Sequence, residues 1–259
     1  MPPRPAAGPE LELHQLLPTR RTITIGELLA RLEPGKQIPA HRPHTIVNFI
    51  ASVDGRAAFK GRSGQLGDVG DRAMFHGLRE QADAIFAGTG TMRTERYGRL
   101  APDPERRKRR AANGLSPEPL ACLISRTGDI PTEIPLFAEP ESRIVIFSPG
   151  EPDLSKAAAE VTTVRLDPGE LTLTTMLRRL RADYDVRVLL CEGGPTVFGA
   201  LLHEALVDEL FLTVAPKLAG GGTDPATTSG PVLDELAQLA LVWALEREGS
   251  LFLRYELNG

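Results

Sequence analysis

From Arg42 onward, the sequence alternates short apolar, β-branched runs with segments of helical periodicity, and this alternation constrains the fold most strongly. Such runs are typical of strands buried on both faces, and the helical segments between them can serve as the crossovers of a parallel sheet. We therefore expect an α/β fold with a mostly parallel central sheet. The predicted strands cover residues 45–51, 84–87, 120–124, 143–147, 161–164, 186–191, 209–214, 239–246 and 251–257.

Three segments between these runs repeat apolar residues at spacings of three and four. This spacing predicts amphipathic helices over residues 71–81, 172–184 and 196–206. The last two strands flank a short turn at Glu248, Gly249 and Ser250, which predicts a C-terminal antiparallel hairpin, and we place this hairpin at the sheet edge.

Size and charge narrow the classes of protein that fit. A chain of 259 residues, 41% of them hydrophobic, can bury a large core, and we expect one main domain. The formal net charge of −4 gives no general attraction to nucleic acid or to an anionic membrane. No apolar stretch approaches the roughly 18 residues of a membrane span, and no signal-peptide pattern opens the chain. We expect a cytoplasmic protein without membrane or nucleic-acid partners.

Cysteines and histidines provide no recognisable site. Cys122 and Cys191 each lie in an apolar run without a Cys-x-x-Cys pattern, and the five histidines fall at no metal-ligand spacing. The sequence also lacks the Gly-x-Ser-x-Gly elbow of serine hydrolases. We therefore expect no disulfide, no metal and no serine triad.

Two segments lie outside the alternating pattern. Residues 1–42 contain short apolar patches between prolines, and we expect an N-terminal extension that packs on a main domain of residues 43–259, with a frayed tail over residues 1–10. Residues 99–119 are charged and proline-rich without an apolar period, which predicts a surface loop. We interpret the basic run at 106–110 as solvated, because no aromatic residues are interleaved with it.

The sharpest chemical motif is VRVLLCEGGPTVFGALL at residues 186–202. A predicted strand ends at Glu192, turns through Gly193, Gly194 and Pro195, and opens a helix at Thr196. Glycines allow close approach of the backbone to a ligand, and the start of a helix attracts phosphate. A simple tight turn is the alternative. Glu192 favours a ligand site, because a carboxylate at the end of a parallel strand projects into the crevice where open α/β sheets bind ligands.

Polar residues also follow the strand at residues 84–87. Gly88, Thr89, Gly90 and Thr91 form a Gly-x-Gly run that lacks the third glycine of the dinucleotide fingerprint. The run is either a second loop that approaches phosphate or a flexible turn, and the residues leave both possibilities open.

Two other predicted strands carry polar groups at or near their ends. Asn48 lies within the first strand, where its amide either pairs with backbone or faces a ligand, and Asp54 is typical of a turn former. Ser125 and Arg126 follow the strand at 120–124, and a hydroxyl beside a guanidinium can hold a phosphate monoester.

Four segments together, IASVDGRAA, REQADAIFAGTGT, LISRTGDIP and LLCEGGPTVFGALLHEALVDELFLTVAPKL, resemble the RibD-type pyrimidine reductases of riboflavin biosynthesis. The resemblance covers residues 43–257. It implies a three-layer, dihydrofolate-reductase-like fold, a homodimer, and reduction by NADPH of 5-amino-6-(5-phosphoribosylamino)uracil to the ribitylamino form. The zinc deaminase half of bifunctional members is not matched.

The resemblance also implies roles for individual residues. The implied cofactor-binding residues are Ala51, Ser52, Gly88, Thr89, Gly90, Thr91, Glu95, Ser125, Arg126, Gly193, Gly194, Pro195, Thr196 and Val197. The implied substrate-binding residues are Asn48, Ser63, Arg79 and Glu192. Glu192 and Glu95 are the candidate catalytic residues, which would position substrate or mediate proton delivery.

The sequence departs from the family pattern after Thr91. The usual acidic pair, proline and phosphate-binding Arg or His are replaced by a run in which Glu95 keeps one acid and Arg96 or Arg99 can substitute for the phosphate anchor. The sequence therefore identifies the substrate less closely than it identifies the cofactor. A pteridine or dihydrofolate reductase is the alternative within the same chemistry, and a non-catalytic NADPH-binding protein is the alternative outside it.

Overall fold

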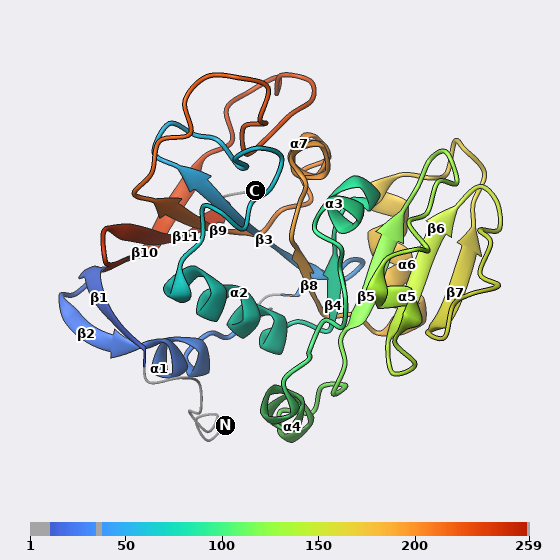
Figure 1. The fold of residues 1–259 in the computed structure, drawn as a ribbon, viewed down its shortest axis with the longest axis horizontal. Coiled ribbons are helices and arrows are strands. Elements are labelled where there is room, and N and C mark those ends of the chain that lie inside the picture. The colour runs from blue at the N-terminus through green and yellow to red at the C-terminus, as the bar shows by residue number, and fades with distance from the viewer. Residues whose placement is uncertain (1–10, 35–37, 258–259) are drawn as a thin grey trace.

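The structure is a computed structural model that describes residues 11–34 and 38–257 (Figure 1). Its strands are β1 (Glu12–Leu17), β2 (Arg21–Thr24), β3 (His44–Ser52), β4 (Ala84–Phe86), β5 (Leu120–Ile124), β6 (Arg143–Ser148), β7 (Glu160–Arg165), β8 (Val188–Cys191), β9 (Glu209–Ala215), β10 (Leu239–Arg247) and β11 (Ser250–Leu257). Its helices are α1 (Ile25–Ala30), α2 (Val69–Gln81), α3 (Thr89–Thr94), α4 (Pro104–Ala112), α5 (Pro135–Ala138), α6 (Leu173–Tyr184) and α7 (Pro195–His203).

The strands of the described residues form one sheet in the order β2-β1-β10-β11-β9-β3-β8-β4-β5-β6-β7. Neighbours from β9 to β7 in this order are parallel, whereas β11, β10, β1 and β2 add antiparallel pairs. This topology confirms the expected α/β class with a mostly parallel sheet and a C-terminal hairpin.

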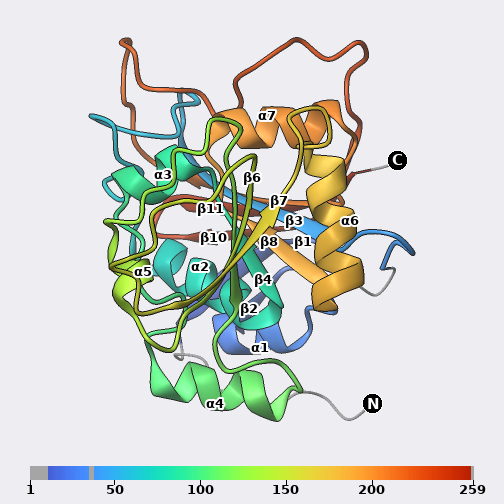
Figure 2. The ribbon, with the colours of Figure 1, turned by 90° about the vertical axis from the view of Figure 1, so that its right-hand side faces the viewer.

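Helices cover both faces of the sheet and produce three layers (Figure 2). One apolar cluster joins the sheet to α1, α2, α3 and α5 through residues such as Leu28, Met74 and Met92. The second cluster joins the other face to α6 and α7 through Met176 and Phe198. Because both faces are buried, the central strands β4, β5 and β8 are apolar along their whole length, which explains why they lack strict alternation.

The placement of the C-terminal hairpin at the sheet edge is wrong. Strand β10 pairs on its outer side with β1, with His14 opposite Glu246, and β2 then forms the edge. Residues 11–30 supply β1, β2 and α1, and Thr24 and Glu27 form a reciprocal capping box that starts α1. The predicted frayed tail at residues 1–10 lies outside the described residues, and the division at residue 42 stays a prediction.

The prediction of a surface loop over residues 99–119 is also wrong, because residues 104–112 form α4, which packs on α2. The side chains of Arg106 and Arg109 both form ion pairs with Glu80 of α2. Arg110 is only 1% exposed. Three residues of the basic run therefore help to pack α4 on α2, through ion pairs or burial. Sequence periodicity does not reveal these contacts.

Arg110 ties α4 to the C-terminal end of α2. Its guanidinium donates hydrogen bonds to the carbonyl oxygens of Arg79 and Ala82 at 2.6 and 2.7 Å, and to that of Ser116 at 2.9 Å. The carbonyls of Arg79 and Ala82 belong to the last turn and the C-cap of α2, where helix carbonyls lack intrahelical donors. Burial lowers the pKa of Arg110 to about 10, against the opposing effect of Asp83, Glu118 and Glu80.

We expect Arg110→Met to lower the free energy of unfolding by about 3 kcal/mol, because it leaves these carbonyls without a donor. Urea unfolding followed by circular dichroism measures the change. Lys108→Met is a matched control on the same helix, because the Lys108 side chain is 73% exposed and pairs only with Glu105 among the described residues. If Arg110→Met unfolds at the same urea midpoint as Lys108→Met, the hydrogen bonds of Arg110 do not stabilise the fold.

Candidate active site

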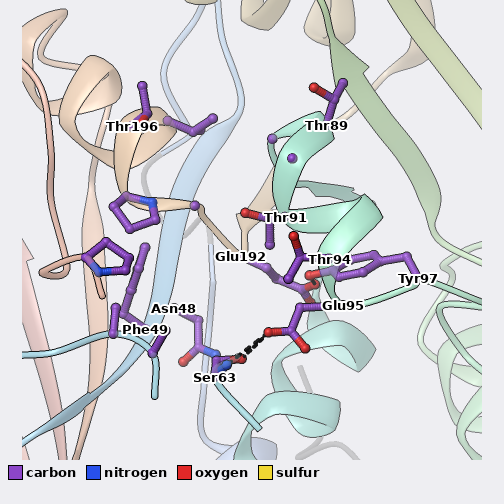
Figure 3. A pocket seen from close by; sticks show the side chains of 18 of the residues that line it. Asn48, Phe49, Ser63, Thr89, Thr91, Thr94, Glu95, Tyr97, Glu192 and Thr196 are labelled. Carbon is purple, nitrogen blue, oxygen red and sulfur yellow. Dashed lines mark hydrogen bonds between the residues drawn. The ribbon is translucent and has the colours of Figure 1, made fainter. Parts of the chain in front are cut away.

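A cavity of about 1060 Å³ lies at the carboxyl ends of β3, β4, β5 and β8 (Figure 3). The segments that follow these strands line it through Gly88, Ser125 and Glu192, and α2 contributes Arg79. This is the edge where parallel α/β sheets bind ligands, because the loops that leave neighbouring parallel strands converge there.

None of the helices in the described part of the chain has the length and apolar character to cross a membrane.

One arm of the cavity is built from two glycine turns in direct contact. The Gly88 N–H donates to the carbonyl of Gly193 at 2.7 Å. A Cβ atom on Gly194 would lie 2.5 Å from the Thr91 hydroxyl oxygen, and Gly193 has a φ of +91°. The peptide between Gly193 and Gly194 is cis. The glycines are therefore required by the close approach of the two turns, as their position between strand and helix indicates.

These turns place two helix starts beside the same arm. Helix α7 begins at Pro195 after an N-cap glycine that makes no side-chain hydrogen bond, and its first N–H groups belong to Thr196 and Val197, which line the cavity. The run at 88–91 is the start of α3 rather than a flexible turn. Figure 3 shows Thr89 and Thr196 on opposite walls of this arm. An uncapped helix start attracts an anionic group.

The far end of this arm contains Ser125, Arg126 and Thr127, which follow β5. Ser125 is buried, and its hydroxyl lies 3.5 Å from that of Thr127. Arg126 is exposed and makes no hydrogen bond or ion pair with any residue that the structure describes. The guanidinium is therefore available to an anionic ligand.

The other arm is lined by α2, β3 and the segments around Ser63 and Glu95. The backbone N–H and the hydroxyl of Ser63 both donate to Glu95 at 3.0 Å. Figure 3 shows the Ser63 and Glu95 side chains joined in this way. Asn48 lies beside this pair, on the wall formed by β3. These three predicted residues come from widely separated segments and meet in one polar corner.

Glu192 lies between the two arms in a buried ion pair. Its carboxylate accepts hydrogen bonds from Arg79 Nε and Nη2 at 2.6 and 2.8 Å, and from the Tyr97 hydroxyl at 2.7 Å. The side chain of Glu192 is 1% exposed. The Arg79 guanidinium also lies 4.3 Å from the centre of the Phe75 ring. The carboxylate is therefore fixed in one orientation.

The ionisation of this cluster follows from its burial. Burial lowers the pKa of Arg79, but the Glu192 carboxylate raises it more, so the pKa lies above its ordinary value. Burial raises the pKa of Tyr97 well above its usual range, and the nearby Glu192 carboxylate adds to the effect. Tyr97 thus remains a hydrogen-bond donor to Glu192 across the physiological range.

The structure does not bring every expected residue to the cavity wall. Ala51, Ser52 and Gly193 are absent from the lining residues, although Gly193 supports the turn. The Ser52 hydroxyl instead donates to Asp54 at 2.5 Å, and Asp54 also accepts backbone N–H groups from residues 219 and 220. Asp54 is thus the turn former that its sequence context predicts. Of the two candidate phosphate anchors, Arg96 lines the cavity, whereas Arg99 pairs with Glu118 and Glu141.

Asp71, Phe75 and Tyr97 line the cavity and were not predicted. Asp71 and Phe75 could have been found, because they lie eight and four residues before Arg79 and therefore share its face of α2. No sequence pattern indicates Tyr97, because its contact with Glu192 depends on the path of the chain after α3.

Burial raises the pKa of Asp71 to about 6, partly opposed by a hydrogen bond from Thr213, while the nearby Asp68 carboxylate raises it further. Because the folded-state pKa is raised, protonation is favoured by folding. The contribution of Asp71 to the free energy of unfolding is therefore complete below the ordinary pKa near 4. It is lost as the pH rises through about 6.

We expect Asp71→Asn to leave the free energy of unfolding nearly unchanged at pH 4 and to raise it by about 2–3 kcal/mol at pH 8, since an amide has no ionised form. Urea denaturation across this pH range measures the effect. Equal urea midpoints for variant and wild type at pH 8 would show that burial does not destabilise the ionised Asp71 carboxylate.

Comparisons with known proteins place the chain in a family. The family model described as the RibD C-terminal domain matches residues 43–248. A protein of Archaeoglobus fulgidus named 2,5-diamino-6-ribosylamino-4(3H)-pyrimidinone 5′-phosphate reductase is 28% identical over 195 residues, which cover 73% of this chain and 87% of that protein. The riboflavin biosynthesis protein RibD of Mycobacterium tuberculosis is 32% identical over 181 residues, and the match covers 69% of this chain but 44% of that protein.

The solved structures agree with the sequence relatives. A pyrimidine reductase-like protein of Corynebacterium diphtheriae superposes with a TM-score of 0.69 and 25% identity, over 84% of this chain and 92% of that one. The family model spans most of the chain and includes both glycine turns and Glu192. The chain belongs to the RibD C-terminal domain family.

Proposed function

We propose that this protein is an NADPH-dependent reductase of riboflavin biosynthesis, which reduces 5-amino-6-(5-phosphoribosylamino)uracil to the ribitylamino form. The observation that carries the proposal is the two-armed cavity of about 1060 Å³. Ligand pockets measure about 300–1000 Å³, so this cavity is at the large end of the range, and its two arms offer separate places for a cofactor and a substrate. The relatives named as pyrimidine reductases support the choice of reaction.

The arm with the glycine turns fits a dinucleotide. An added Cβ at Gly194 would fill the space between the turns, and α7 presents an uncapped N-terminus there. We assign the pyrophosphate to this helix start, and the 2′-phosphate of NADPH to Ser125 and Arg126. When bound, NADPH would supply a hydride equivalent to the substrate.

The other arm fits a polar heterocycle with a sugar phosphate. Asn48 and Ser63 offer hydrogen bonds, while Glu192 and Glu95 are positioned by their partners to orient the substrate. The Arg96 side chain lines the cavity without a hydrogen bond or ion pair to any described residue, so it is the guanidinium that we assign to the substrate phosphate.

The proposal is tested by NADPH oxidation with purified protein. Separate reactions contain the deaminated ribosylaminopyrimidine phosphate, its 2,5-diamino counterpart and dihydrofolate. We expect preferential turnover of a ribosylaminopyrimidine phosphate, and the diamino compound is included because the archaeal relative is named for it. Preferential turnover of dihydrofolate would indicate a pteridine reductase, and NADPH binding without any turnover would indicate a non-catalytic protein.

We expect Arg96→Ala to raise KM for the phosphorylated substrate about tenfold with little change in kcat, because a charge-assisted contact to phosphate is worth about 1.4 kcal/mol or more. Steady-state kinetics measure both constants. The matched control is the same substrate without its phosphate, for which wild type and variant should have similar KM. A KM for the phosphorylated substrate unchanged by the substitution would move the anchor elsewhere.

The expected homodimer and cytoplasmic location also remain proposals. Exposed apolar side chains gather near the start of β10, at Leu236, Leu239 and Leu241, and burying them against a second copy would remove them from water. Sedimentation equilibrium should give about twice the chain mass of 28.0 kDa.

A further inference from the structure

Helix α2 presents a chemically distinct stripe to the substrate arm of the cavity. Asp71, Phe75 and Arg79 recur every four residues and all line the cavity. Arg79 is occupied by Glu192, and Phe75 packs against the Arg79 guanidinium. Asp71 is the member of this stripe that carries a carboxyl group, and it lines the same cavity.

The other carboxyl groups of the cavity wall are held by strong donors. Glu192 receives three hydrogen bonds from Arg79 and Tyr97. Glu95 receives two from Ser63, and Glu204, in the cofactor arm, receives two from Thr174. Donors of the protein therefore already engage each of these three carboxyl groups.

The surroundings of Asp71 differ from these. The group is partly buried on α2, and its side-chain hydrogen bond comes from the hydroxyl of Thr213 on β9. The charged groups that act on it are Asp68 at the N-cap of α2, Arg72 within α2, and Lys217 from the segment after β9. Lys217 is itself directed to the carbonyls of Gln65 and Leu66. No ion pair holds Asp71 among the described residues.

The proposed reaction requires a proton as well as a hydride. For the ribose to open, the bond between C1′ and the ring oxygen breaks with its electron pair on oxygen, and the exocyclic nitrogen forms a C1′=N iminium. Hydride addition to C1′ then converts the iminium to the amine. The balance is one hydride to C1′ and one proton to the ring oxygen, so a group at the site must supply that proton.

We propose, on the basis of the proposed function, that Asp71 is the general acid that protonates the ribose ring oxygen as the sugar opens. Its carboxyl proton passes to the leaving oxygen, and the resulting carboxylate is reprotonated from solvent through the open mouth of the cavity. The raised pKa of about 6 supports this role, because an acid is most effective when its pKa lies near the working pH.

The test is the pH dependence of kcat and KM between pH 5 and 9, measured by NADPH oxidation with saturating cofactor. In the wild type, kcat should fall as the pH rises above about 6, while the carboxyl group loses its proton. Asp71→Asn should lower kcat at pH 6 by about 100-fold or more, change KM less than about threefold, and remove the pH dependence in this range. Asp71→Glu should recover part of the rate.

Two comparisons make the result specific. Asp183→Asn makes the same chemical change on the exposed side of α6 and should leave both constants unchanged. Glu95→Gln tests the earlier hypothesis of proton delivery by Glu95, and we expect it to raise KM while preserving the wild-type pH profile. Because Asp71→Asn should be more stable than wild type above pH 6, a loss of activity there is not a loss of folded protein.

The outcomes separate this inference from the proposed function. If the wild type turns over no ribosylaminopyrimidine, the proposed function fails and the role of Asp71 fails with it. If the wild type is active and Asp71→Asn retains its kcat and pH profile, only the assignment of the acid is overturned. A rise in KM with unchanged kcat would likewise overturn it, since Asp71 would then bind substrate without donating a proton.

Discussion

Replacing Glu192 by glutamine is expected to lower the free energy of unfolding by about 3–5 kcal/mol and to reduce turnover about 100-fold or more. The physical reason is that Arg79 is buried and its charge is compensated by Glu192 through two hydrogen bonds of 2.6 and 2.8 Å. A glutamine amide leaves this charge uncompensated and presents an NH₂ group to a donor. Urea unfolding and NADPH oxidation measure the two effects.

A double substitution separates the structural role of the pair from its role in the site. Arg79→Met with Glu192→Leu removes both charges, and we expect it to recover most of the lost stability, since a buried ion pair contributes little net stability over apolar side chains of similar volume. Its activity should stay low, because the Glu192 carboxylate that orients the substrate is missing. Wild-type turnover in the double variant would show that Glu192 serves the fold alone.

Replacing Gly194 by valine is expected to raise the Kd for NADPH about 100-fold, which corresponds to about 2.7 kcal/mol. The first side-chain carbon would lie 2.5 Å from the Thr91 hydroxyl oxygen, so the turn before α7 and the start of α3 must separate. Their separation moves the α7 N-terminus away from the position we assign to the pyrophosphate. Titration of NADPH fluorescence measures the affinity, and Gly194→Ala should give a smaller change of the same sign.

Two variants test whether this contact is the cause. Combining Thr91→Ala with Gly194→Ala removes the oxygen that the new Cβ would meet, so the two substitutions should weaken binding by less than the sum of their separate effects. Gly150→Ala is the control, because its added Cβ meets no atom within 4 Å. Unaltered NADPH affinity in Gly194→Val would place the cofactor elsewhere.

Most elements of the main domain could be predicted from local pattern. The nine predicted strands correspond to β3–β11, and the three predicted helices correspond to α2, α6 and α7 within a few residues. Apolar periodicity is a local property, so a single sequence reveals it. The short elements α3 and α5, and α4 with its basic surface, give weak or misleading local signals and were not predicted.

The strand-end residues of the site were predictable for a related reason. A parallel sheet brings the carboxyl ends of its strands to one edge, so Gly88, Ser125 and Glu192 can be assigned to one cleft as soon as their strands are recognised. The roles of individual residues in this cleft stay predictions until binding and kinetic measurements test them.

Local patterns in the chain are sufficient to assign the α/β class, the glycine turn and the carboxylate that follows β8. Long-range packing places β1 outside the hairpin, buries Arg110, and brings Arg79 and Tyr97 to Glu192. These contacts join residues such as Arg79 and Glu192, 113 positions apart, and local propensity carries no information about such pairs. The environment of Asp71 has the same origin, because its burial depends on β9 and α2 packing together, and burial sets the ionisation on which its proposed role rests.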